Sequence, residues 1–454
     1  MPRIPAIRAI LPVALLLLAA ACGEPERPPH IFLISIDTLR ADYLEPYGFD
    51  AVETPTARRL AEGGVLFTRA VTPMGITVPV HATMLTGLMP RRHAVRANVH
   101  RLPDEVPTVA AALSGAGYRT ASILSFGAMN FMAGLDRGFE HASDRDEAGR
   151  EFVRGDSETL EMALEWLGRQ DGSEPLFMLV HFYDVHSPHL PTGHTPSMPD
   201  GYTGPLADGV GVETLYNESH QTIAGRPEEL AALRALYAGE AATADHRAGQ
   251  FIDALREKGL LDNAIVIYVA DHGQGLGEND YFGHGPTLEQ TVLHVPLIIR
   301  DFRAPARGRR VTETVGLIDL APTILGLAGI PDDGLPGRDL LAVGGESEPA
   351  VYLSEVEQRS SQTEFRPEHY DEQALAAFFD DFKLVEQDGG QRLYRIDDEW
   401  GQHIEPVALD EMHESLRAWL SDTMQAYREG SLESERAELD DEALEKLRSL
   451  GYIQ

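Results

Sequence analysis

The stretch HIFLISID, at residues 30–37, is a run of apolar side chains that ends in a carboxylate, and it indicates the fold. Two further runs have the same character, LFMLVHFY at 176–183 and AIVIYVA at 264–270. A nearly continuous apolar strand is typical of a parallel sheet that is covered on both faces. Shorter strand-like runs occur at 65–71, 119–124 and 296–300, and helical patterns alternate with them at 56–63, 108–115, 157–168, 228–258 and 318–327. We therefore predict an α/β fold, with a mostly parallel sheet and helices on both faces.

An aspartate ends or follows each of the three long apolar runs, namely Asp37, Asp184 and Asp271. Ligands of open parallel sheets bind beyond the carboxyl ends of the strands, so we expect these carboxylates to meet at one edge. A single carboxylate at a strand end is commonly a turn or helix-cap residue. Three of them, each beside further histidine or threonine residues, indicate a functional site.

The chain has 454 residues, of which 43% are hydrophobic, which suffices for one large domain and a smaller appendage. From about residue 340 the pattern changes to short strand-like runs at 350–354, 382–386 and 392–396, followed by charged helical stretches at 409–427 and 440–449. We predict a main domain at 30–340 and a small C-terminal α+β subdomain at 341–454. Segment 190–226 is rich in Gly, Pro, Thr and His, and we predict a long insertion loop beside the site that selects the substrate as a lid.

The net charge is −34, from 72 acidic and 38 basic residues. Such a surface repels nucleic acid and anionic lipid headgroups, so we expect no nucleic-acid partner. If the substrate is an anion, we expect bound metal cations to offset the negative potential of the protein at the site.

The N-terminus has the pattern of an export signal. Arg3 and Arg8 precede an apolar run at 10–21 that ends in three alanines before Cys22, the only cysteine. We predict a signal peptide at 1–21 and a tether at 22–29. Cys22 after small residues resembles the lipobox of bacterial lipoproteins, which implies an exported, membrane-anchored lipoprotein facing the periplasm or cell surface. The alternative is an ordinary cleaved signal. No later stretch is long and apolar enough to span a bilayer, so a lipidated Cys22 is the only membrane contact we expect.

Chemistry-bearing residues gather in four segments of the chain. These are Ser35-Ile36-Asp37-Thr38, TVPVHATMLTG at 77–87, DVHSPH at 184–189, and Asp271-His272-Gly273 followed by Gly283-His284-Gly285. Carboxylates and imidazoles together suit zinc, manganese or a similar divalent ion. Because the segments are far apart in sequence, the site they predict is a tertiary one.

These segments resemble, in the same order, the sulfatase group of the alkaline phosphatase superfamily. The joint pattern is an early strand-end Asp, x-Pro-x-x-Ala-x-x-Leu-Thr-Gly, Asp-His-Gly and Gly-His-Gly, spread over about residues 30 to 330. The final LRSLGY at 447–452 also resembles the tail of bacterial sulfatase-like lipoproteins. The resemblance implies that the domain at 30–340 is catalytic.

The resemblance also implies roles for particular residues. Thr77 takes the position of the nucleophile, at the N-terminus of a helix, and Asn98 matches a residue that donates to a substrate oxygen in phosphodiesterase-like relatives. His81 stands where sulfatases have an Arg, so it faces the substrate or supports a ligand. The implied ligands of the metal that holds the nucleophile are Asp37, Asp271 and His272. The implied ligands of a second metal are Asp184, His186 and His284, with His189 as the alternative to His186; direct contact with substrate oxygens, without a metal, is the other option.

Three departures bear on the reaction. Common sulfatases carry a Cys or Ser that is oxidised to formylglycine, which Thr77 cannot become. Most also have a second Asp where Thr38 stands, and Val80 and His81 replace the usual Ser and Arg. We therefore expect a metal-dependent hydrolase that cleaves a phosphate mono- or diester, or a related oxyanion ester, through a covalent Thr77 intermediate.

The expected cofactors are two divalent ions, zinc or manganese, with calcium as a further option. The expected substrate is a small-molecule ester or an ester of a glycan or lipid. The alternatives are a sulfatase that acts without formylglycine, a headgroup phosphotransferase acting on envelope glycans or lipids, and an inactive surface-binding lipoprotein.

Overall fold

The structure is a computed structural model that describes residues 27–143, 153–216, 218–285, 287–344, 350–356, 374–398, 400–432, 435–436 and 445. The predicted signal peptide, Cys22 and most of the tether lie outside the described residues, as does the expected helix at 440–449 apart from Glu445. Among the helices that are described, none is both long and apolar enough to cross a membrane.

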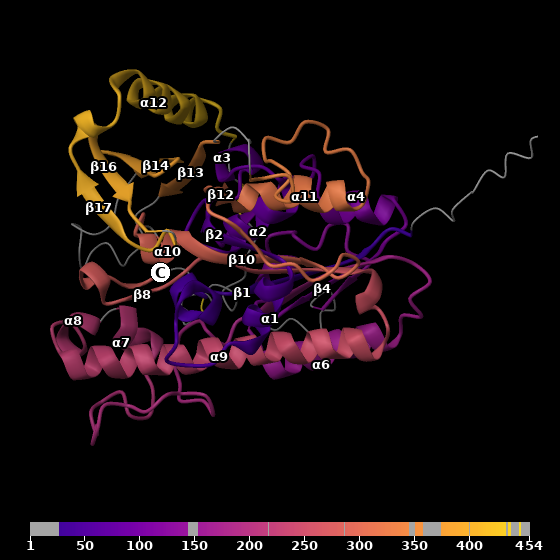
Figure 1. The fold of residues 1–454 in the computed structure, drawn as a ribbon, viewed down its shortest axis with the longest axis horizontal. Coiled ribbons are helices and arrows are strands. Elements are labelled where there is room, and N and C mark those ends of the chain that lie inside the picture. Colours follow the sequence, from indigo (N-terminus) through magenta and orange to yellow (C-terminus); the bar gives the residue numbers. More distant parts are fainter. Residues whose placement is uncertain are drawn as a thin grey trace, which may run out of the picture.

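A nine-stranded sheet forms the centre of the main domain (Figure 1). Its strands are β1 (His30–Ile36), β2 (Val65–Val71), β4 (Arg119–Leu124), β5 (His141–Ala142), β6 (Leu176–Phe182), β7 (Ala264–Ala270), β10 (His294–Asp301), β11 (Arg309–Val311) and β12 (Val315–Gly316). Their order is β11-β2-β10-β7-β1-β6-β4-β5, with β12 also paired to β2. All pairs are parallel except those of β10, which runs antiparallel to β7 and β2. The predicted mostly parallel sheet is confirmed.

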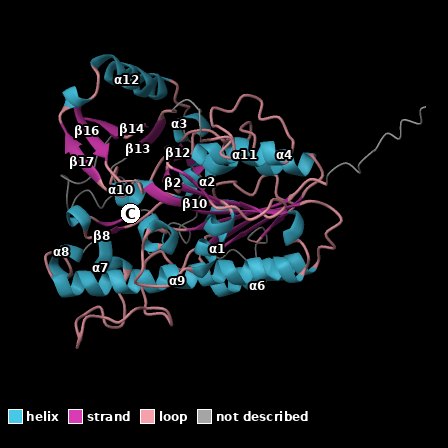
Figure 2. Cartoon of the chain, viewed as in Figure 1, coloured by secondary structure: helices cyan, strands magenta, loops and turns pink. Residues whose placement is uncertain are grey.

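Helices cover both faces of this sheet (Figure 2). One layer contains α1 (Pro55–Gly63), α6 (Asp156–Gly168) and α9 (Pro227–Glu257), and the other contains α2 (Thr77–Thr86), α4 (Val109–Gly115) and α11 (Leu320–Leu327). The shorter helices are α3 (Pro90–His93), α5 (Ala128–Phe131), α7 (Val212–Tyr216), α8 (Ser219–Thr222) and α10 (Gln290–Leu293). The two-layer arrangement follows from the continuous apolar strands, which need cover on both sides.

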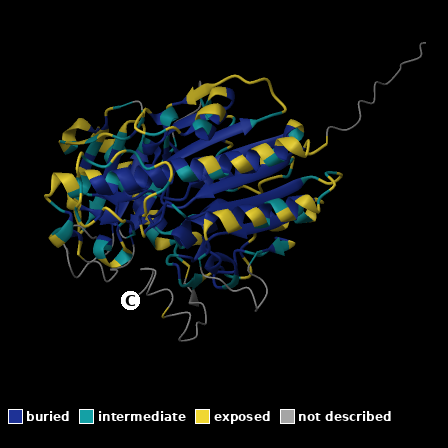
Figure 3. Cartoon of the chain, turned by 90° about the horizontal axis from the view of Figure 1, so that it is seen from below, coloured by how far each residue is buried: buried dark blue, intermediate teal, exposed yellow. Residues whose placement is uncertain are grey.

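The three apolar runs form the centre of the core. Every residue of β1, β6 and β7 is buried, while the helices expose their outer faces (Figure 3). Each fully buried Val, Leu, Ile or Phe side chain contributes about 1.5–3 kcal/mol. Burial of these runs is therefore a large part of what holds the domain together.

The register of these strands aligns their carboxyl ends. Ile36 of β1 lies opposite Phe182 of β6 and opposite Ala270 of β7. The residues that come next are therefore Asp37, Tyr183 and Asp271, and the N–H of Asp37 donates to Phe182 O at 2.9 Å. Tyr183 is therefore the residue aligned with Asp37, and Asp184 lies one residue beyond it.

The C-terminal part is a smaller antiparallel sheet with one long helix. Its elements are β13 (Tyr352–Val356), β14 (Ala374–Phe379), β15 (Phe382–Gln387), β16 (Gly390–Ile396), β17 (Ile404–Val407) and α12 (Glu414–Glu429). Along β14 alternate residues face opposite sides: Leu375 packs in the cluster beneath α12, and Phe378 packs in the cluster with Leu288 of the main domain. The expected α+β character is confirmed, although β14 and β17 were not predicted.

Candidate active site

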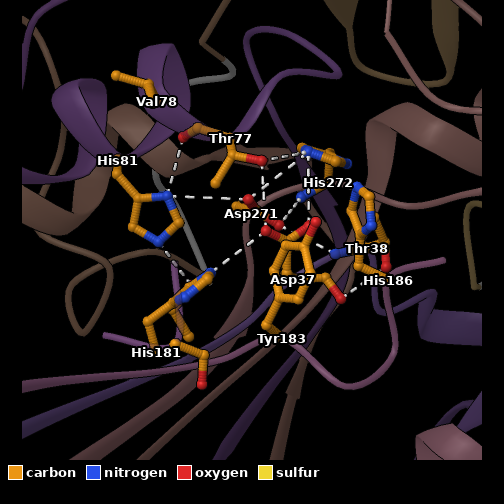
Figure 4. Close-up of polar contacts among 12 residues, drawn as sticks. Asp37, Thr38, Thr77, Val78, His81, His181, Tyr183, His186, Asp271 and His272 are labelled. Carbon is orange, nitrogen blue, oxygen red and sulfur yellow. Dashed lines mark hydrogen bonds and ion pairs between the residues drawn. The ribbon is translucent and has the colours of Figure 1, made fainter. Parts of the chain in front are cut away.

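Two carboxylates meet at the end of the central strands (Figure 4). Asp37 and Asp271 are both completely buried. Oδ1 of Asp271 accepts hydrogen bonds from the N–H of Thr38 at 3.2 Å and from the N–H of His272 at 2.8 Å. Oδ1 of Asp37 and Oδ2 of Asp271 have no hydrogen-bond partner within the described part of the chain. Two bare carboxylate oxygens buried this close together favour a bound cation.

Thr77 lies directly beside these carboxylates. It is the first residue of α2 and is completely buried. Its Oγ1 is 3.3 Å from Oδ2 of Asp37 and 3.3 Å from Nε2 of His272. The first amides of a helix have no intrahelical acceptor, and the helix dipole is positive there, so this position stabilises an oxyanion. The structure thus brings the predicted nucleophile to the predicted metal ligands.

Asn98 reaches the same helix end from a turn. Its Oδ1 accepts the N–H of Val78, the second residue of α2, at 2.9 Å, and the side chain is nearly buried. With the oxygen occupied in this way, the amide nitrogen is the group that can donate toward an oxyanion at Thr77. Asn98 is therefore both a turn residue and a candidate donor to the substrate.

Three imidazoles direct an Nε2 lone pair toward this region. In each of them Nδ1 contacts a backbone carbonyl oxygen, which can only accept, so Nδ1 carries the proton and Nε2 is bare in the neutral ring. The contacts are His272 Nδ1 with Gly273 O at 3.1 Å, His284 Nδ1 with Gly75 O at 3.1 Å, and His186 Nδ1 with Ser187 O at 2.8 Å. This arrangement is the usual one for histidines that bind metals, because the carbonyl fixes the tautomer and the ring orientation.

Protonation equilibria point to the same conclusion. Burial raises the pKa of Asp37 to about 8, and burial together with the neighbouring Asp37 raises the pKa of Asp271 to about 7. Burial also lowers the pKa of His272 to about 4, which keeps its ring neutral. A divalent cation would favour ionised carboxylates and neutral imidazoles, so the donor set fits a metal.

The triad predicted to hold the nucleophile's metal is assembled. Ligand atoms of Asp37, Asp271 and His272 all lie within 4.8 Å of one another, and all three residues are buried. Two carboxylate oxygens and one imidazole nitrogen suit zinc or manganese. An ion held there would lie beside the Thr77 hydroxyl.

The residues predicted for a second metal are only partly brought together. Nε2 of His186 and Nε2 of His284 are 2.9 Å apart, and the ring of His284 stacks on that of His272 with centroids 4.6 Å apart. Because both Nε2 atoms are acceptors in the neutral tautomer, a cation or a shared proton between them relieves their repulsion. These two histidines are the candidates for a second ion.

Asp184 has other contacts. Its Oδ1 accepts the N–H of Asp156, the first residue of α6, at 3.1 Å, and its own N–H donates to Oδ2 of Asp156 at 3.1 Å. The one-residue offset at the end of β6 explains this, because Tyr183 takes the place beside Asp37. The role of Asp184 as a metal ligand stays a prediction, and its observed contacts are those of a helix-capping carboxylate.

His189, the alternative to His186, lies in a separate hydrogen-bonded chain. Its Nδ1 is 2.7 Å from Oε2 of Glu240 in α9, and its Nε2 is 3.4 Å from Nε2 of Gln274. All three side chains are buried. The geometry therefore favours His186 as the histidine of this segment that faces His284.

His81 supports the nucleophile's helix. Its Nδ1 donates to Thr77 O at 2.9 Å, and its Nε2 is 3.0 Å from the Ser35 hydroxyl. Nδ1 is also 3.8 Å from Oδ2 of Asp271. Both ring nitrogens thus have partners within the protein, which favours the supporting role for His81 over the substrate-facing one.

His181 is a site residue that the sequence analysis missed. It lies within β6, completely buried, and its Nε2 is 3.4 Å from Oδ2 of Asp37. Its ring meets that of His81 edge-on, with centroids 4.9 Å apart. A lone histidine inside the run LFMLVHFY was the available signal, since an imidazole in an all-apolar strand needs a polar partner.

The backbone after Asp37 is strained. Thr38 has φ of 56°, in the left-handed region that a β-branched residue rarely adopts. Its N–H bonds to Asp271, and its carbonyl accepts the Tyr237 hydroxyl at 2.6 Å. These contacts hold the strained turn, and such strain is common where a site must be preorganised.

The insertion at 190–226 approaches the site through α7. Tyr216 of α7 meets the His284 ring edge-on, with centroids 5.9 Å apart. Gly283 has φ of 86°, and a Cβ there would lie 2.1 Å from the Tyr216 ring, so this position requires glycine. The predicted place of the insertion beside the site agrees with this contact, and its role in selecting substrates stays a prediction.

The sheet, the buried carboxylate–imidazole cluster and the hydroxyl at the helix N-terminus agree with the fold and the site that the resemblance to sulfatases implies. The sulfatase family profile matches residues 29–330, and the chain belongs to the sulfatase family. The predicted family and the predicted class of enzyme, an ester hydrolase, are confirmed.

Two relatives by sequence are both sulfatases. An arylsulfatase of Clostridium perfringens is 26% identical over 379 residues, covering 69% of this chain and 78% of the relative. Human arylsulfatase K is 25% identical over 392 residues, covering 75% of this chain and 72% of the relative.

Solved structures share the fold across most of the chain. The phosphonate monoester hydrolase of Agrobacterium radiobacter superposes with a TM-score of 0.67 at 22% identity, covering 91% of this chain and 99% of its own. A protein in complex with D-glucosamine-2-N,6-O-disulfate, its substrate, superposes with a TM-score of 0.68 at 18% identity, covering 89% and 99%. The same fold thus occurs in a protein described as a phosphonate monoester hydrolase and in one described with a disulfated glucosamine as its substrate.

Proposed function

We propose that the protein hydrolyses a phosphate ester, a diester or a related oxyanion ester through a covalent intermediate on Thr77. The observation that carries this proposal is the position of the Thr77 hydroxyl, 3.3 Å from both Asp37 and His272 at the N-terminus of α2. A free hydroxyl is a weak nucleophile at neutral pH and needs such surroundings to react.

The residues divide the work as follows. Oγ1 of Thr77 attacks the phosphorus atom and loses its proton, for which Oδ2 of Asp37 lies within reach. The bond from phosphorus to the leaving-group oxygen breaks, and the alcohol or phenol departs after taking up a proton from solvent. The charge that develops on the phosphoryl oxygens faces the amide end of α2 and the side-chain nitrogen of Asn98. Water then attacks the phosphorus atom and gives up a proton, the P–Oγ1 bond breaks, and Oγ1 takes back a proton as the phosphate product leaves. A divalent cation, when bound by Asp37, Asp271 and His272, supplies Lewis-acid activation of the hydroxyl and charge stabilisation.

Phosphate esters suit this site better than sulfate esters for two reasons. A phosphate monoester carries nearly two negative charges and a sulfate monoester one, and a cationic pocket inside a −34 protein favours the group that develops more charge. In addition, formylglycine hydrate expels sulfate by collapsing to its aldehyde, whereas a threonine ester has to be cleaved by an activated water. Among phosphate esters we propose diesters or phosphonate-like monoanions, because Asn98 resembles the diesterase pattern and no Arg stands at His81. These substrates carry one negative charge, as a sulfate monoester does, so for them the second reason is the one that applies.

A sulfatase that acts without formylglycine is the second candidate. The family profile and the two relatives described above favour it, since both relatives are sulfatases. Against it stands Thr77, which offers a hydroxyl in place of an aldehyde hydrate.

One comparison decides between the two. The measurement is kcat/KM for one aryl leaving group attached to sulfate, to phosphate and to a phosphodiester, with enzyme loaded with zinc, manganese or calcium. We expect the phosphodiester or phosphate to be turned over fastest. If the aryl sulfate is faster by tenfold or more, roughly 1.4 kcal/mol, the sulfatase candidate replaces the phosphoesterase.

We also propose that the enzyme works at a membrane surface, where Cys22 carries lipid and the tether at 22–29 links it to the domain. Its substrate is then a small-molecule, glycan or lipid ester met outside the cytoplasm. The support for this proposal is the sequence of the N-terminus alone.

A further inference from the structure

One buried lysine connects the C-terminal subdomain to the segment that follows His284. Lys383 of β15 is 1% exposed. Its Nζ donates to Leu288 O at 2.5 Å and lies 3.5 Å from Oε1 of Gln290. The same ammonium group is 5.2 Å from the centre of the Phe378 ring. Burying an ammonium group is unfavourable unless its N–H donors form hydrogen bonds. A lysine buried at this position therefore indicates that its contacts with residues 288 and 290 have a role.

The choice of lysine is itself unusual in this chain. Lys258, Lys383 and Lys446 are its only lysines, and arginine provides the other basic side chains. An ammonium on a flexible stem is a compact group that can point at one carbonyl, which the planar fork of arginine does less well. Burial lowers the pKa of Lys383 to about 8, in agreement with its surroundings.

The segment that Lys383 holds is joined to His284 by backbone contacts. The N–H of Thr287 donates to Gly285 O at 2.8 Å, and Gly285 forms a β-bridge with Gly75. Gly75 also accepts the proton of His284 Nδ1 at 3.1 Å. His284 and the segment 287–290 are therefore both connected to Gly75, the segment through Gly285. A shift of the segment would move the imidazole ring of His284.

A second contact fastens the segment to the same subdomain. Nε2 of Gln290 donates to Gly401 O at 2.6 Å, and Gln290 is nearly buried. Leu288 packs in the hydrophobic cluster that contains Phe378. Residues 288 and 290 are thus held by side-chain packing as well as by hydrogen bonds.

We propose that Lys383 is a positioning residue, which holds residues 287–290 and thereby fixes the His284 imidazole beside His186. The C-terminal subdomain then contributes to catalysis through this contact, although it supplies none of the candidate ligands. The role of His284 in the reaction, on which this proposal relies, rests on the function proposed above.

A double-mutant cycle tests whether Lys383 acts through His284. In the metal-loaded full-length protein, Lys383→Met should lower kcat about tenfold to a hundredfold, because a small misplacement of a catalytic group has effects of this size. In a His284→Ala background the same substitution should change kcat by less than about twofold, since coupled residues are not additive. Lys258→Met, at an exposed lysine, is the matched control and should behave as wild type. An equal loss of kcat in both backgrounds would overturn the proposal.

Hydrogen–deuterium exchange gives a readout that does not depend on activity. Lys383→Met should speed amide exchange in peptides covering residues 287–293 and leave 264–270 of β7 protected. Lys383→Arg and Gln290→Ala remove fewer of these contacts than Lys383→Met. They should show the same local change to a smaller degree, and they replace Lys383→Met if that variant fails to fold. Exchange that is unchanged at 287–293 in all three variants would refute the proposal that Lys383 holds this segment. If His284→Ala itself leaves kcat unchanged, the role given to His284 is wrong, and the exchange data alone decide whether Lys383 holds the segment.

Discussion

Replacing Thr77 with alanine separates the nucleophile from the rest of the site. The side chain is completely buried and makes two polar contacts, each 3.3 Å long, which is long for hydrogen bonds to a hydroxyl. Their loss should cost about 1 kcal/mol of folding stability. The helix itself should remain, because Thr77 is its first residue and not its N-cap. Loss of the attacking oxygen should lower kcat by at least about two orders of magnitude, on the order of 3 kcal/mol of barrier.

The assay is steady-state turnover of an aryl phosphodiester with metal-loaded protein, together with thermal unfolding of the same samples. Thr83→Ala is the matched control, since Thr83 lies on the same helix, is equally buried and contacts His93 at 3.0 Å, away from the carboxylates. It should lose similar stability and keep its kcat. A wild-type kcat in Thr77→Ala would remove Thr77 from the mechanism.

Three further outcomes are expected. In metal-free protein the pKa of Asp37 is raised to about 8 and that of Asp271 to about 7, so above their unfolded pKa values the folded state keeps protons that the unfolded chain has lost, and stability falls as the pH rises. The lowered pKa of His272 has the opposite effect on stability, but this effect ends near the unfolded pKa of histidine, about 6.5. The melting temperature in chelator should therefore fall between about pH 6.5 and 8 and become flatter with added metal, and a rise over that range would contradict the burial argument. His284→Ala should lower the bound metal, measured by elemental analysis, from about two ions per chain toward one, whereas an unchanged content would favour direct contact of His284 with substrate oxygens. Cys22→Ser should move the protein from the membrane fraction to the soluble fraction, and a soluble wild type with another mature N-terminus would end the lipoprotein proposal.

The sheet was predictable from sequence because its central strands are unusually uniform. Runs such as 30–37 and 264–270 are almost continuously apolar, which favours strands buried on both faces, and every residue of β1 and β7 is buried. β14 was missed because ALAAFF has neither alternation nor β-branched residues. Its strand conformation depends on pairing with β13 and β15 and on packing on both of its faces. Tertiary contacts of this kind leave no local pattern.

The site was predictable where the family pattern and the strand ends coincide. Asp37, Asp271, His272 and Thr77 are adjacent as expected. The contacts of Asp184 could not be foreseen, because they depend on where β6 ends relative to β1, which is a matter of one residue. His181 was hidden within a strand.

The neighbours of His186 and His189 also required the structure. Both imidazoles lie in the same six-residue segment, and sequence spacing cannot tell which of them turns toward His284. The structure separates them, because His189 forms a hydrogen bond with Glu240 of α9, whereas His186 lies beside His284. A buried carboxylate on a helix distant in sequence thus determines which of the two histidines faces His284.

The most direct test of the central claim is to look for the covalent intermediate. Metal-loaded protein is mixed with excess aryl phosphodiester, quenched in acid within the first turnovers, digested and examined by mass spectrometry. The account predicts that the peptide containing Thr77 carries the esterified phosphoryl group, and that Thr77→Ala yields no adduct. Two results together would contradict the account. The Thr77 peptide of an active enzyme would stay unmodified, and the product formed in labelled water would have inverted configuration at phosphorus, as a single direct displacement by water requires.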